Sequence, residues 1–105
     1  MLHLTFEAET RVVSFRYDEA GRRFLLHRLA GALPRDHCFF VREDFTASPF
    51  DYVSIDCRTG SPTGIAELSA DASALAILCP PHAIELLLSA LQAGNNAAGE
   101  ACLRL

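Results

Sequence analysis

The sequence contains no run of apolar residues long enough to cross a lipid bilayer, which takes about 18 or more in succession. Its first residues also lack the basic segment followed by an apolar segment that marks a secretory signal peptide. These absences exclude a membrane-spanning helix from the expected structure. They predict a cytoplasmic protein with no membrane partner.

Positive charge is scarce, because lysine is absent and nine arginines face thirteen acidic residues, for a net charge of −4. General nucleic-acid binding is therefore excluded, since it needs a basic surface that neutralises phosphates. Residues 1–28 carry five arginines and four acids, whereas residues 29–105 carry four arginines and nine acids. The acidic surplus in the second part of the chain favours a basic protein partner.

Motifs that identify an enzyme are also missing, including a phosphate-binding glycine loop, GxSxG and HExxH. Asp51 and Asp56 lie five residues apart on a predicted strand, so they point to opposite faces and do not form a carboxylate pair. We therefore predict no cofactor and assign no catalytic residue.

The four cysteines lie in or beside apolar or strand-like segments, which predicts reduced thiols in the core. His37 precedes Cys38, but neighbouring residues on an extended chain point to opposite faces, so this histidine is poorly placed as a base. Cys79 and His82 have the spacing of half a metal site. A second pair at ligand spacing is missing, and we predict no metal.

The composition, half hydrophobic and 21% charged, predicts a globular protein, and the length fits a single α+β domain over residues 1–105. Leu2, Leu4 and Phe6 alternate with polar residues, as on a strand with one buried face. Similar patterns predict further strands, at 12–17, 38–44, 51–57, 65–70, 73–79 and 99–105.

Residues 18–31 are compatible with two structures. Asp18 and Gly21 suit a tight hairpin turn, after which residues 22–29 return as a strand. Asp18 could equally cap a helix that ends at Gly31, although Gly21 costs such a helix about 1 kcal/mol relative to alanine. The hairpin is favoured, the helix is the alternative, and residues 30–36 are expected to form a loop.

A helix is predicted over residues 81–93. Two prolines, Pro80 and Pro81, follow the apolar strand that ends at residue 79, and proline is tolerated in the first turn of a helix. Its polar residues form one narrow stripe, so we expect burial on most of its circumference. The apolar positions are Ile84, Leu86, Leu87, Leu88 and Leu91.

The predicted fold is a mostly antiparallel, twisted sheet of about six to eight short strands, packed against this one long C-terminal helix. A possible second helix lies at 18–31, and a C-terminal strand ends the chain. One helix covers only two or three strands, so we expect the sheet to curl, to gain the second helix or to pair with another copy in a homodimer.

The segment 43–52 combines acidic and aromatic residues in a proline-containing connection. Loop aromatics beside charges are typical anchors of protein interfaces, because a rigid ring contributes a large contact area at little entropic cost. The alternative is that both phenylalanines belong to the core. The predicted partner-binding residues are Glu43, Asp44, Phe45, Phe50, Asp51 and Tyr52.

These features favour a small, acidic, non-enzymatic bacterial protein that binds a basic protein partner. In size, acidity and lack of catalytic motifs it is similar to immunity proteins and other small inhibitors. The alternative is a small thiol-dependent enzyme or small-ligand-binding protein, with a pocket between helix 81–93 and the sheet and with Cys38 or Cys79 as its thiol.

Overall fold

The computed structural model of the chain describes residues 1–35, 37–57, 63–93 and 98–105, without the side chains of residues 31–35. These residues form seven strands, two α-helices and one short 3-10 helix. In chain order they are β1 (Leu2–Glu7), β2 (Val12–Tyr17), α1 (Glu19–Arg35), β3 (His37–Val41), η1 (Arg42–Asp44), β4 (Tyr52–Cys57), β5 (Ile65–Leu68), β6 (Ala74–Cys79), α2 (Pro81–Gln92) and β7 (Gly99–Arg104). Neither α-helix, over the part described, is long and apolar enough to span a bilayer.

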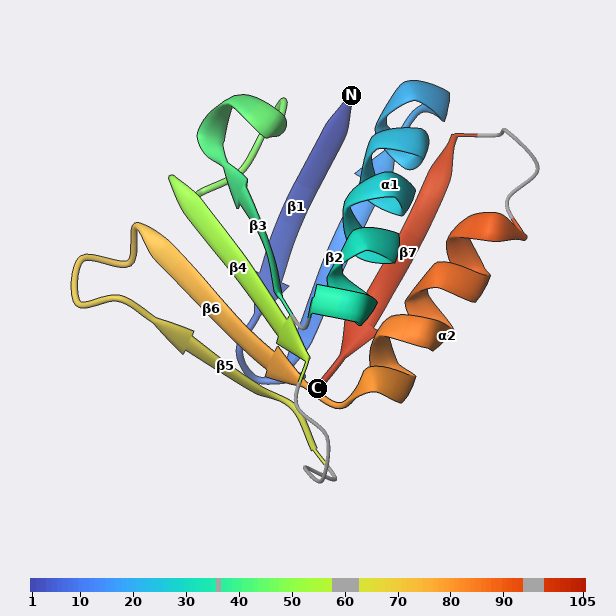
Figure 1. The fold of residues 1–105 in the computed structure, drawn as a ribbon. Helices are drawn as coiled ribbons and strands as arrows, with labels where there is room; N and C mark the ends of the chain where they lie inside the picture. Colours follow the sequence, from blue (N-terminus) through green and yellow to red (C-terminus); the bar gives the residue numbers. More distant parts are fainter. Residues whose placement is uncertain (36, 58–62, 94–97) are drawn as a thin grey trace.

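The strands form two sheets, not the single sheet expected from the sequence (Figure 1). One sheet has three antiparallel strands in the order β1-β2-β7. The other has four strands in the order β3-β4-β6-β5, in which β4 and β6 are parallel and the remaining pairs are antiparallel. The α+β class and the mostly antiparallel pairing are thus confirmed.

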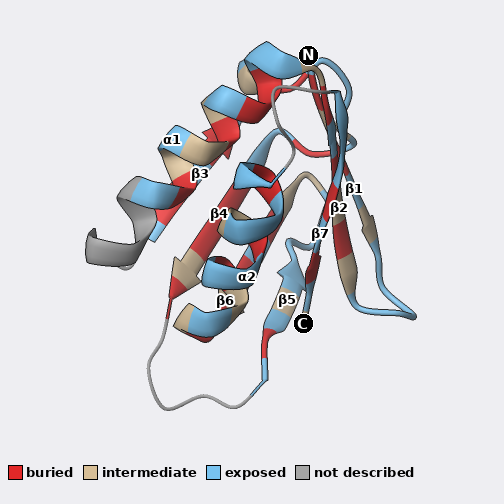
Figure 2. Cartoon of the chain, turned by 90° about the vertical axis from the view of Figure 1, so that its right-hand side faces the viewer, coloured by how far each residue is buried: buried red, intermediate tan, exposed pale blue. Residues whose placement is uncertain are grey.

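Alternation of apolar and polar residues explains which face of each sheet is buried. Leu4 on β1 pairs with Phe15 on β2, which pairs with Ala101 on β7, and all three are buried. In the four-stranded sheet, Cys38, Ile55 and Ile77 form an equivalent buried row. The buried residues of both sheets and both helices belong to one core, and Figure 2 shows buried residues on strands of both sheets and on both helices.

Residues 19–35 form helix α1, so the favoured hairpin is wrong, as is the loop expected at 30–36 over its described residues. The side chain of Asp18 caps the helix by accepting a hydrogen bond from the backbone N–H of Gly21, at 2.9 Å. Gly21 serves close packing and not a turn, since a Cβ atom there would lie 1.8 Å from the carbonyl oxygen of Met1. Leu25 and Leu29 then continue its buried face at four-residue spacing.

Helix α2 begins at Pro81, as predicted, but its burial differs from the prediction. Only Ile84, Leu87 and Leu91 are buried among its residues, and Leu86 is 67% exposed. The reason is that two helices cover the sheets together. Helix α1 packs beside α2 and contacts β3 and β4, so α2 contacts only part of the sheet surface, chiefly β7 (Figure 1). The predicted C-terminal helix is thus confirmed in part: it is present, but it is the shorter of two helices, and the second helix that was considered possible at 18–31 is α1.

The two sheets are joined at both ends of the core. Near β1, the N–H of Leu4 donates to the carbonyl of Ala47 at 3.2 Å, and the N–H of Thr46 donates to the carbonyl of Leu2 at 2.9 Å. At the other end, the Arg11 side chain donates to the carbonyl of Gly64. Curling into two sheets and gaining a second helix, two of the three expected solutions, are both present and cover one face of each sheet, while the homodimer stays a prediction.

Candidate functional site

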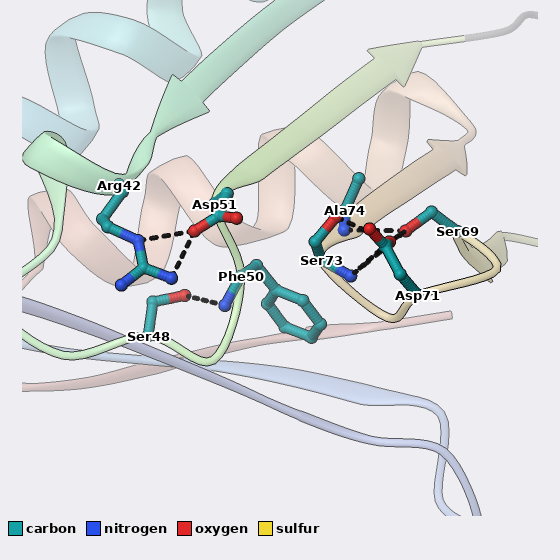
Figure 3. Close-up of polar contacts among 8 residues, drawn as sticks. All are labelled: Arg42, Ser48, Phe50, Asp51, Ser69, Asp71, Ser73 and Ala74. Atoms are coloured by element: carbon teal, nitrogen blue, oxygen red, sulfur yellow. Dashed lines mark hydrogen bonds and ion pairs between the residues drawn. The ribbon is translucent and has the colours of Figure 1, made fainter.

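The segment 43–52 lies beside the turn that joins β5 to β6 (Figure 3). The backbone N–H of Asp51 donates to the carbonyl of Ser73 at 2.7 Å, and that of Tyr52 donates to the same oxygen at 3.4 Å. In the turn, the Asp71 carboxylate accepts hydrogen bonds from the hydroxyls of Ser69 and Ser73, each at 2.7 Å. These bonds lower the pKa of Asp71 to about 2. The turn therefore supplies a rigid, negatively charged support for the start of β4.

The three predicted carboxylates of the segment have different surroundings. Asp51 forms an ion pair with Arg42, and Asp44 accepts a hydrogen bond from the N–H of Val41 at 2.8 Å. Glu43 is exposed and makes no described hydrogen bond or ion pair. Two of the three carboxylates thus stabilise the local fold, which leaves Glu43 as the one with no described internal partner.

The two phenylalanines of the segment lie in the core, where the alternative hypothesis placed them. Phe45 is 8% exposed and its ring centroid lies 5.5 Å from that of Phe40, while Phe50 is 6% exposed. The Ser48 hydroxyl accepts a hydrogen bond from the N–H of Phe50 at 3.1 Å and so holds the chain where it turns inward (Figure 3). Of the three predicted aromatic anchors, only Tyr52, at 39% exposed, is at the surface.

Tyr52 belongs to a surface that the sequence did not identify, the outer face of the β3-β4-β6-β5 sheet. The Tyr52 ring stacks on Phe39 with centroids 5.8 Å apart and planes 18° apart, and Phe39 lies 5.9 Å from the His37 ring. His37 in turn pairs with Asp56 on the neighbouring strand. The signal for this surface was available in "HCFFV", where apolar residues occupy both faces of one strand.

A shallow hollow of about 250 Å³ indents this outer face. Its lining consists of Tyr52 and Ser54 of β4, Glu67 and Leu68 of β5, Ser69 of the turn, and Ala74, Leu75 and Ala76 of β6. Tyr52 is paired in register with Ala74, and Ser54 with Ala76, which pairs with Glu67. Partners in register share a face, so a carboxylate and an aromatic ring flank two small alanines.

The cysteines are poorly suited to nucleophilic chemistry. Burial raises the pKa values of both Cys38 and Cys79 to about 12, so both thiols are protonated at neutral pH. His37 is exposed whereas Cys38 is buried, so the two side chains point to opposite faces, as the alternation predicted. Three cysteines are buried as expected, but Cys102 is exposed and is not a core thiol.

The two residues with the spacing of half a metal site also have different surroundings. Cys79 is buried and His82 is exposed, so these two residues do not converge. Within the described ranges, no group of three or more His, Cys, Asp or Glu side chains could hold a metal ion.

Comparisons with known proteins add no assignment to this geometry. No protein-family model, curated protein or solved structure matches the chain significantly.

Proposed function

We propose that the chain is a non-enzymatic module that binds a basic protein partner through the outer face of the β3-β4-β6-β5 sheet. The observation that supports this most directly is the exposure of large apolar side chains there, with Phe39 at 45%, Tyr52 at 39% and Ile65 at 46%. A partner that covers such a face removes apolar area from water, and exposed apolar patches rimmed by polar groups are typical of binding surfaces.

Acidic groups on and around this face support a basic partner. Glu67 and Asp56 belong to its strands, Asp71 lies in the β5–β6 turn, and Asp51 directly precedes β4. Complementary charge speeds encounter and selects the partner. In size, acidity and lack of catalytic motifs the chain is similar to immunity proteins and other small inhibitors, so inhibition of the bound partner is the proposed outcome.

The test compares a variant on the face with a matched variant elsewhere. Tyr52→Arg puts a positive charge in the proposed interface, whereas Leu86→Arg puts the same charge on the exposed side of α2. Immobilised wild-type, Tyr52→Arg and Leu86→Arg proteins are incubated with lysate of the source cell. The retained proteins are then quantified by mass spectrometry, after thermal denaturation has shown that each variant is folded.

The expected result is a basic protein that wild type and Leu86→Arg retain in stoichiometric amount and that Tyr52→Arg loses. Its retention should also fall with salt, because the screening length drops from about 8 Å at 0.15 M to about 3 Å at 1 M. Equal retention by all three proteins would overturn the assignment of this face. So would a wild-type dimer in sedimentation that Tyr52→Arg dissociates, because a second copy would then be the occupant.

A further inference from the structure

The hollow on the outer sheet face has a floor of small side chains between two larger ones. Ala74 and Ala76 are separated by one residue on β6. Tyr52 on β4 lies beside Ala74, and Glu67 on β5 lies beside Ala76. A side chain entering from a partner would thus pass between an aromatic ring and a carboxylate. The volume of about 250 Å³ accommodates one long side chain and not a folded element.

The Glu67 carboxylate is available to such a ligand. Glu67 is exposed, and no hydrogen bond or ion pair of this side chain occurs within the described part of the chain. The acidic residues nearby differ in this respect, since Asp51 pairs with Arg42 and Asp56 with His37. The hollow therefore contains a negative charge that the described fold does not neutralise.

The Tyr52 ring is held in place to form the opposite wall. Its near-parallel stacking on Phe39 and the two backbone bonds to Ser73 fix both the ring and the start of β4. A fixed aromatic face attracts a cation through its quadrupole, and a planar cation can also stack on it.

We propose that this hollow receives an arginine side chain of the partner protein. The guanidinium group would bind the carboxylate of Glu67 and stack on Tyr52, while its methylene groups would cover Ala74 and Ala76. This inference rests on the proposed function and names the chemical group by which the basic partner is recognised. Arginine fits better than lysine, because its planar fork matches a carboxylate in two hydrogen bonds and stacks on a ring, whereas an ammonium does neither.

The direct test uses small probes and not the partner. ¹⁵N-labelled protein is titrated with N-acetyl-arginine amide, with the neutral isostere N-acetyl-citrulline amide and with N-acetyl-lysine amide. We expect saturable, millimolar shifts of the amide signals of Ser54, Glu67 and Ala76 with the arginine probe, and much weaker shifts with the other two. Equal shifts with citrulline or lysine, or none with arginine, would overturn the inference.

Matched carboxylate variants separate this inference from the proposed function. Glu67→Gln should weaken arginine binding at least about tenfold, because it removes a charge-assisted pair. Glu43→Gln, which neutralises an exposed acid outside the hollow, should leave it unchanged. If Tyr52→Arg abolishes partner capture but Glu67→Gln captures as well as wild type, the face is correct and the arginine site is wrong. If Tyr52→Arg captures normally, the proposed function itself fails.

Discussion

Burial determines which thiols of this chain can react. Cys38, Cys57 and Cys79 are buried, and the pKa values of Cys38 and Cys79 are raised to about 12, whereas Cys102 is exposed on β7. We expect one of the four thiols to react with a disulfide reagent in the native protein at neutral pH and all four to react after unfolding. The absorbance of the thiolate that the reagent releases gives the number of reactive thiols in the native protein and in the unfolded protein.

The Cys102→Ser variant is the control for this prediction, because it removes the exposed thiol. In its native state, this variant should show no rapid reaction of any thiol with the reagent. Rapid modification of Cys38 or Cys79 in this variant would show an accessible thiolate. That outcome would revive the thiol-dependent enzyme as the competing function.

The same residue scale shows what the sequence could reveal about the site. Tyr52 was predicted on the same grounds as Phe45 and Phe50, as an aromatic residue beside acidic ones, although it also begins a strand whose sequence alternates polar and apolar residues and whose next residue, Val53, is buried. Phe45 and Phe50 lie in a connection without such a pattern, so charge and composition could not tell an exposed ring from a buried one. Glu67 was missed because its importance depends on strand register, which places it across β6 from Ser54.

At the scale of elements, the connection between η1 and β4 contains a buried ring, Phe50, and leads to an exposed ring, Tyr52, at the start of β4. Phe50→Ala should lower the free energy of unfolding by about 3–5 kcal/mol, because it leaves a cavity at a buried ring. Tyr52→Ala should cost only about 1 kcal/mol, chiefly the stacking on Phe39. Urea denaturation measures both. A small loss for Phe50→Ala would place its ring at the surface and restore it as a binding anchor.

The strands were predicted better than the helices for a physical reason. Alternation along β1, β2 and β7 is local, so Leu4 was assigned to a buried face from sequence alone, and it is buried, as are Phe15 and Leu103 in the strands predicted at 12–17 and 99–105. Helix α1 depends on contacts far along the chain. Gly21 weakens an isolated helix, but its missing side chain makes room for the Met1 backbone, a requirement that no local pattern shows.

At the scale of the whole molecule, the two helices connect the two sheets. Helix α1 packs on β3 and β4, helix α2 packs on β7, and the two helices pack on each other (Figure 1). Arg22 lies in this contact. It is 7% exposed and donates a hydrogen bond from Nη1 to the carbonyl of Leu91 at 3.0 Å. A guanidinium near the C-terminal end of α2 also interacts favourably with the helix dipole.

Arg22→Ala should therefore lower the free energy of unfolding by about 2–3 kcal/mol, because it removes a charge-assisted hydrogen bond and the packing of a buried stem. Arg23→Ala is the matched control on the same helix: its exposed ion pair with Glu19 should contribute no more than about 0.5 kcal/mol. Far-ultraviolet circular dichroism and fluorescence of the tyrosines should give coincident urea transitions in both variants, since both sheets share one core. Separate transitions in Arg22→Ala would mean that the sheets fold independently and that the helix contact does not couple them.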